Sequence, residues 1–147
     1  MLNALSVASC ACVLIELASV RPVAAVNVPG ELIGSWRAED VGDGGAIGDP
    51  EAVLDIREDG TYGGIGGCNM FTGVLSLSER TIAFGSVEAG RTICAPAIME
   101  QEQRFLGTLK KELTWKVDGA TLTLTGPDGA SVMRLTSAQP TSSGITG

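Results

Sequence analysis

The sequence predicts a mostly β (α+β) fold, an antiparallel sheet of about eight short strands that is curled or closed into a small barrel with one packed helix. Three observations predict this architecture. Twenty glycines against six aromatic residues favour a turn-rich β protein. Short runs of alternating hydrophobicity recur along the chain, and one segment has helical periodicity. The length of 147 residues allows one domain and little more.

Asp-Gly pairs mark the expected hairpins, because such turns need positive φ and glycine adopts it without strain. Extended runs flank each pair: AVLDIRE and TYGGI, TWKV and TLTLT, and TLTLT and SVMRL. In TLTLT the leucines alternate with threonines and therefore share one face of a strand. The pairs are Asp59-Gly60, Asp118-Gly119 and Asp128-Gly129.

The stretch AIMEQEQRFLGTLKKEL, directly after Pro96, is predicted to be helical. Proline suits the first turn of a helix. Glu100 lies early in this stretch and Lys110 and Lys111 lie late, an order that complements the helix dipole. One broad face of the helix is expected to carry Ile98, Glu102, Phe105, Leu106, Leu109 and Leu113.

Composition excludes several classes of function. The formal charge of −7 argues against a nucleic-acid partner and against attraction to an anionic membrane. The sequence has no histidine, which removes Ser-His-Asp and Cys-His catalysis and histidine-zinc enzymes. We therefore expect no enzyme, no cofactor and no bound metal.

Two glycine-rich segments invite chemical interpretations that their details do not support. TYGGIGGCN has neither the spacing of a phosphate-binding loop nor the Lys-Ser/Thr that would follow it, so we expect a bent strand and turn. The segment from Arg37 to Glu51 is expected to be a solvated acidic loop, because its spacing does not match a calcium-binding EF-hand. Its acidic residues are Glu39, Asp40, Asp43, Asp49 and Glu51.

Residues 1–26 are predicted to be an export signal. Val23-Ala24-Ala25 offers a cleavage site just before Val26, whereas Val7-Ala8-Ser9-Cys10 resembles a lipobox that would leave Cys10 acylated. Both signals are atypical, because no Lys or Arg precedes the apolar stretch; an apolar first strand of a cytoplasmic domain is the alternative. The domain is expected over 27–136, with a flexible tail over 137–147.

Cys68 and Cys94 are the two cysteines outside the export segment. In an exported chain they are expected to form a disulfide, which the chain-entropy model values at about 3.5 kcal/mol for a loop of this size. Two buried free thiols are the alternative in a reducing compartment. A zinc site would need Cys10 and Cys12 as further ligands and is not expected.

Four motifs, in order and at fitting spacing, resemble the META/HslJ-like domain, a family of small bacterial envelope or secreted proteins. The resemblance covers most of 31–136, and its departures are Gly90, where the family more often has threonine, and the atypical export signal. The motifs are Leu32-x-Gly34-x-Trp36, Gly67-Cys68-Asn69-x-Phe71-x-Gly73, Gly90-Arg91-Thr92-Ile93-Cys94-Ala95-Pro96 and Glu102-x-x-Phe105-Leu106-x-x-Leu109.

The resemblance implies an incompletely closed antiparallel barrel with one helix, and motif residues that determine the fold rather than catalyse a reaction. Gly67 and Gly73 would hold bends that a side chain would obstruct. Asn69 would bond to nearby backbone. Arg91 would anchor a carboxylate or carbonyl near the cysteine pair.

Together with these observations, the resemblance implies a monomeric, non-enzymatic module of the cell envelope, periplasmic or secreted, which binds a protein partner in stress response or envelope integrity. A barrel that binds a lipid or another amphiphile is the first alternative. An inhibitor of a secreted protease is the second. Contact with a membrane is expected only through a lipid anchor on Cys10.

Overall fold

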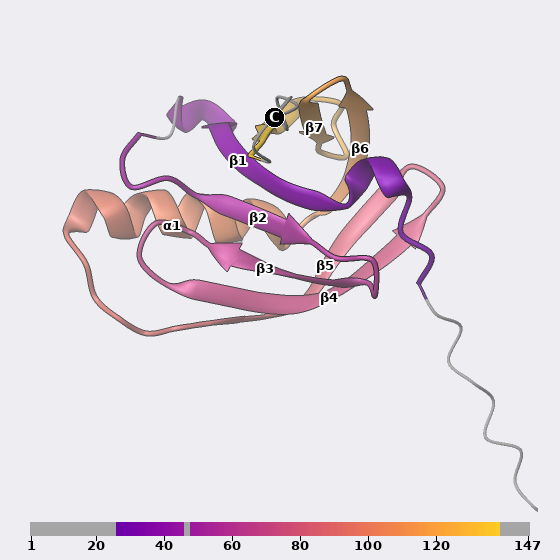
Figure 1. Cartoon of the computed structure of the whole chain (residues 1–147). Helices are drawn as coiled ribbons and strands as arrows, with labels where there is room; N and C mark the ends of the chain where they lie inside the picture. The colour runs from indigo at the N-terminus through magenta and orange to yellow at the C-terminus, as the bar shows by residue number, and fades with distance from the viewer. Residues whose placement is uncertain (1–25, 46–47, 139–147) are drawn as a thin grey trace, which may run out of the picture.

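The computed structural model describes residues 26–45 and 48–138 (Figure 1). The described residues form eight strands, one α-helix and two short 3₁₀ turns, Gly30–Leu32 and Gly42–Gly44. The helix is α1 (Pro96–Leu109). The strands are β1 (Gly34–Val41), β2 (Val53–Ile56), β3 (Thr61–Ile65), β4 (Met70–Ser78), β5 (Thr81–Ala89), β6 (Glu112–Asp118), β7 (Thr121–Thr125) and β8 (Ser131–Ser137).

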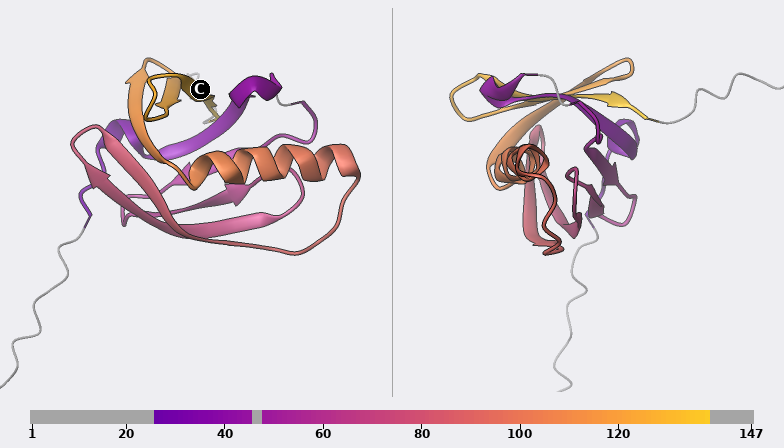
Figure 2. Two further views of the ribbon diagram at one scale, coloured as in Figure 1. Left: turned by 180° about the vertical axis from the view of Figure 1, so that it is seen from behind. Right: turned by 90° about the vertical axis from the view of Figure 1, so that its left-hand side faces the viewer.

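The strands form a ring in which every neighbouring pair is antiparallel. Each strand pairs with the next along the chain, and β1 pairs with β8. The shortest pairing joins β5 to β6, where only Thr81–Ala83 face Glu112–Thr114. Helix α1 lies between the β4–β5 hairpin and strands β6–β8 (Figure 2). This arrangement confirms the predicted incompletely closed antiparallel barrel with one packed helix.

The predicted hairpins are present. Each Asp-Gly pair lies at a turn, between β2 and β3, β6 and β7, or β7 and β8, and Asp118 is the last residue of β6. The glycines have φ of 83° at Gly60, 57° at Gly119 and 83° at Gly129, which is the left-handed region that glycine favours. In the first turn the Asp59 carboxylate accepts bonds from the Thr61 hydroxyl and amide, and these bonds lower the pKa of Asp59.

The helix is shorter than predicted. It ends at Leu109, and Leu113 lies instead in β6, where it is buried beside Trp115 with the alternation of a strand. Leu109 and Leu113 are four residues apart, a spacing that fits one face of a helix. The prediction therefore placed both on the helix, although a turn separates them in the structure. The first turn of α1 contains no acidic residue and the last turn no basic one. The predicted order of charges therefore does not place charged side chains where they would stabilise the helix dipole.

The barrel interior is filled by side chains from all strands and from α1. Tyr62 is fully buried, packs edge-on against Phe84 with ring centroids 5.0 Å apart, and donates its hydroxyl to the Gly85 carbonyl at 3.0 Å. Phe105 of the helix packs on Phe71, with centroids 5.6 Å apart. The largest fully buried side chains are Tyr62, Phe105, Leu32, Leu54, Ile56, Leu75, Ile82, Leu109, Leu113, Leu122, Leu124 and Met133.

The chain ends are described only in part. The export segment, apart from Val26, and the candidate lipidation site Cys10 lie outside the described residues; Val26 itself packs against the core. At the other end, Ser137 belongs to β8 and the Ala138 amide donates to the Ser35 carbonyl at 2.8 Å, so the sheet extends into the predicted tail. Residues 139–147 lie outside the described part. No helix within the described residues is long and apolar enough to cross a membrane.

The buried phenol gives the first prediction. Burial raises the pKa of Tyr62 to about 12, and Tyr62 is the single tyrosine of the chain, so tyrosinate absorbance reports this residue alone. The unfolded chain loses the phenolic proton near pH 10. Between about pH 10 and 12 the folded state therefore holds more protons, and stability should fall with rising pH. A midpoint near pH 10 in the folded protein would contradict this burial.

Candidate functional site

A buried carboxylate of α1 binds the turn between β3 and β4. Glu102 and Asn69 are each 4% exposed. Glu102 Oε2 accepts from the Cys68 amide at 2.9 Å and from the Asn69 amide at 2.5 Å, and Oε1 accepts from Asn69 Nδ2 at 2.7 Å. The side chain that the sequence placed on the apolar helix face thus satisfies the donors of a buried turn.

Asn69 extends this network to the segment between β5 and α1. Its Nδ2 also donates to the Thr92 carbonyl at 2.9 Å, and its Oδ1 accepts from the Thr92 amide at 2.8 Å. A Cβ atom on Gly90 would lie 2.8 Å from Asn69 Oδ1, so glycine at this position leaves room for the side-chain amide. Asn69 does bond to backbone, as the sequence predicted, but it joins three segments rather than one turn.

The predicted disulfide is present in the structure. Cys68 and Cys94 are bonded, with their Cα atoms 6.1 Å apart. The disulfide ties the β3–β4 turn to the segment before α1, two residues beyond the Thr92 contact. This segment is therefore held at two successive points, one covalent and one polar.

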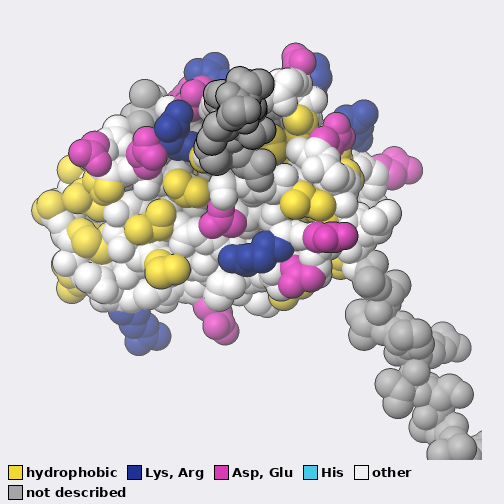
Figure 3. Space-filling view, viewed as in Figure 1, with side chains coloured by type: hydrophobic (Ala, Val, Ile, Leu, Met, Phe, Trp, Pro, Cys, Tyr) yellow, Lys and Arg dark blue, Asp and Glu magenta, His cyan; other side chains and the backbone are white. Residues whose placement is uncertain are grey.

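Exposed apolar side chains lie next to the residues of this buried network along the chain. Met70, directly after Asn69, is 76% exposed, and Ile93, between Thr92 and Cys94, is 87% exposed. Cross-strand pairing sets Met70 opposite Ile65 and Ile65 opposite Val53. We call the half-buried Val53 and Ile65, together with the exposed Met70 and Ile93, the apolar surface. Hydrophobic side chains gather at this end of the molecule, where α1 begins and β3 passes into β4 (Figure 3).

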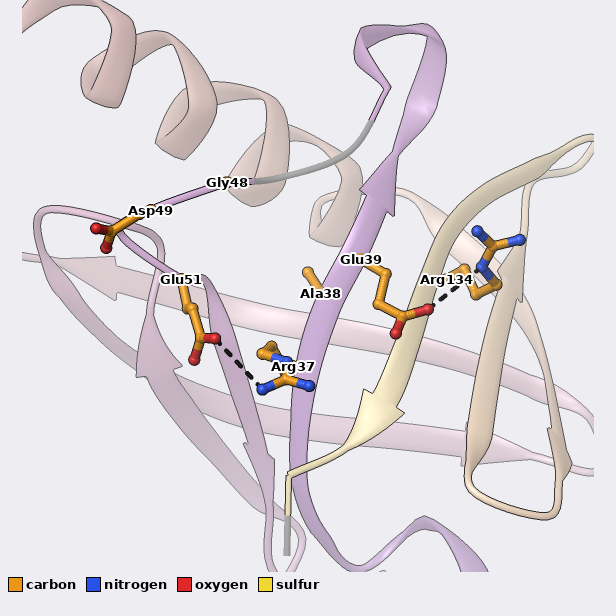
Figure 4. A pocket seen from close by; sticks show the side chains of 7 residues that line it. All are labelled: Arg37, Ala38, Glu39, Gly48, Asp49, Glu51 and Arg134. Atoms are coloured by element: carbon orange, nitrogen blue, oxygen red, sulfur yellow. Dashed lines mark hydrogen bonds and ion pairs between the residues drawn. The ribbon is translucent and has the colours of Figure 1, made fainter.

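A second surface feature is a charged pocket of about 790 Å³ on the outer wall (Figure 4). Arg37 pairs with Glu51 at 3.3 Å, and Arg134 pairs with Glu39 at 3.6 Å. The predicted acidic loop is wrong in part, because Arg37, Glu39 and Asp40 belong to β1. The described residues contain no group of three or more potential metal ligands.

The remaining residues predicted from the family motifs lie at bends, in the core or on the surface. Gly67 has φ of 129° at the bend after β3, and a Cβ atom on Gly73 would lie 2.6 Å from the Gly85 carbonyl. Trp36 donates Nε1 to the Leu32 carbonyl at 2.9 Å. Arg91 is exposed, and within the described residues it has no hydrogen bond or ion pair of the anchoring kind predicted for it.

Sequence reasoning missed several members of the site. Thr92 contributes only backbone atoms, which no side-chain pattern reports. Gln101 donates Nε2 to the Pro50 carbonyl at 2.8 Å, a contact across 51 positions of the chain. Met70 and Ile93 stand inside family motifs, and their position outside the core depends on the turn and the disulfide around them.

Comparison with known proteins identifies the family. The META domain family matches residues 31–139, and the chain therefore belongs to this family. Two NMR structures are similar: one of a protein at 20% identity (73% of this chain, 91% of that chain, TM-score 0.59) and one of a protein from Burkholderia xenovorans at 17% identity (82% and 98%, TM-score 0.60). A DUF4847-family crystal structure from Bacteroides vulgatus is 14% identical (71% and 92%, TM-score 0.50). These likenesses concern the fold alone, and no curated protein matches the chain.

The network predicts a large effect of a small change. Glu102→Gln keeps the shape of the side chain but turns an acceptor into a donor that faces buried N–H groups. It should lower the free energy of unfolding by about 2–4 kcal/mol in urea denaturation with the disulfide intact. Glu100→Gln, an exposed site on the same helix, is the matched control and should change it by less than about 0.5 kcal/mol. Equal stability of the two variants would contradict the structural role of Glu102.

Proposed function

We propose that this chain is a non-enzymatic META-type module of the cell envelope, periplasmic or secreted, that acts by binding a protein partner through the apolar surface in stress response or envelope integrity. The observation that carries the proposal is the exposure of Met70 and Ile93 beside backbone that is already fixed. Exposed apolar side chains that cluster on a small domain are typical of interaction sites.

The fixed backbone supports a binding role energetically. Ordering a loop on association costs free energy, and a loop that is ordered beforehand avoids this cost. Asn69 and the disulfide restrain the residues on both sides of Ile93, and Glu102 restrains the residue before Met70. Methionine is also among the residues enriched at protein interfaces.

Two further observations support the location and the lack of catalysis. Disulfides persist in oxidising compartments, so the bond between Cys68 and Cys94 favours export. The sequence has no histidine, and the Glu102 carboxylate is engaged by three internal hydrogen bonds rather than directed at a substrate. The filled barrel interior gives no support to the alternative of a lipid held inside the barrel.

Substitution of the apolar surface tests the role of the partner. In a strain that lacks the chain and is grown under envelope stress, the Met70→Asp/Ile93→Asp variant should fail to restore growth, because a charge opposes burial in an interface. Val74→Asp is the matched control, since Val74 is 55% exposed and lies four residues farther along β4. Both variants should keep the wild-type midpoint of thermal unfolding. Full restoration by the double variant would contradict the proposal.

Intact mass tests the location. Protein expressed with its own N-terminus and recovered from the envelope fraction should begin at Val26 or carry acyl groups on Cys10. It should also lack the two hydrogens of a reduced Cys68 and Cys94 pair. An unprocessed, reduced chain found only in the cytosol would overturn the envelope assignment.

A further inference from the structure

The charged pocket on the outer wall is built by an irregularity in the sheet. The pairing of β1 with β8 shifts register between Ala38 and Asp40, so Glu39 is the extra residue of a β-bulge. Bulges redirect side chains and recur beside binding sites. Here Glu39 reaches Arg134, while Arg37 turns to Glu51 (Figure 4).

The four side chains form a row of alternating charge. Figure 4 shows Glu51 and Arg37 on one side of Ala38, and Glu39 and Arg134 on the other. Asp49 also lines the pocket, and Figure 4 shows its carboxylate turned away from the other four side chains. The pocket therefore holds two cations and three anions, a mixture that repels a bare anion through its carboxylates and a bare cation through its arginines.

Both arginines retain unused donors. A guanidinium carries five N–H donors in a planar fork. Within the described residues, Arg37 meets one carboxylate through Nη1, and Arg134 meets one through Nε. All four side chains are between 43% and 58% exposed, so the pairs contribute little to stability and can exchange partners at small cost.

We propose that this pocket binds a zwitterionic group, with its oxyanion on the free donors of Arg37 or Arg134 and its ammonium on a neighbouring carboxylate, Glu39 or Glu51. The volume of about 790 Å³ accommodates more than a single amino acid. Two sources share this chemistry: the ends of a short peptide, and the phosphoethanolamine headgroup of a phospholipid. The site is separate from the apolar surface, so its failure would leave the proposed function standing.

Chemical-shift titration of the arginine Nε–Hε groups by NMR tests the inference. Glycylglycine and phosphoethanolamine are the zwitterionic probes, while N-acetylglycine and glycinamide carry one charge each. At least one zwitterion should shift the Arg37 or Arg134 signal saturably in the millimolar range. The single-charge analogues should bind about tenfold more weakly, because each loses one charge-assisted contact.

The probes also separate the two sources. Preference for glycylglycine identifies peptide ends, and preference for phosphoethanolamine identifies a headgroup. The lysine variant of the arginine whose signal shifts, Arg37→Lys or Arg134→Lys, keeps the charge but loses the fork, and should weaken binding of the preferred zwitterion several-fold. Arg57→Gln, which removes an exposed arginine outside the pocket, is the control and should leave binding unchanged. Non-saturable shifts, or equal binding of zwitterion and single-charge analogues, would overturn the proposal.

Discussion

The carboxylate of Glu102 is the contact on which the surroundings of the candidate site depend. A helix laid against the opening of a barrel would normally bury only apolar side chains, and a buried polar group without partners is costly. Glu102 avoids that cost because the β3–β4 turn supplies three donors. These N–H groups of the turn have no partner on a neighbouring strand. The hydrogen bonds between the helix and the turn therefore satisfy the polar groups of both. Asn69 then passes the restraint to Thr92 and the segment before α1.

This dependence explains why the disulfide and the polar network lie side by side. The helix lies between β5 and β6 along the chain, and the chain must cross from the end of β5 to the start of α1 without strand pairing. The crossing segment is held instead by the Asn69 side chain and by the bond between Cys68 and Cys94. Ile93 lies between these two restraints and is turned to solvent. A stable fold thereby presents an apolar side chain in a defined position, which is the property that a binding surface requires.

The local signals in the sequence predicted most of the fold. Asp-Gly pairs and alternating leucines located the hairpins, and the expected export predicted the pairing of Cys68 with Cys94, the two cysteines outside the export segment. The end of the helix was less accessible, because Leu113 continues the spacing of Leu109 while lying in a strand. The acidic segment was predicted to be a loop because its composition is polar. The outward positions of β1 are also charged, because they too are exposed to water, so composition alone does not distinguish a loop from this strand. The site itself was only half visible: Asn69 and Glu102 stood in motifs, but the contact between them spans 33 positions and depends on tertiary packing.

Hydrogen exchange of the backbone amides measures the central claim most directly. The amides of Cys68, Asn69 and Thr92 lie in turns and connecting segments, which ordinarily exchange quickly with solvent. If the Glu102–Asn69 network holds these segments, all three amides should exchange as slowly as those in the centres of β3 and β4. Exchange of the Thr92 amide at the rate of an open loop, with the disulfide intact, would show that the network does not fix the segment that carries Ile93.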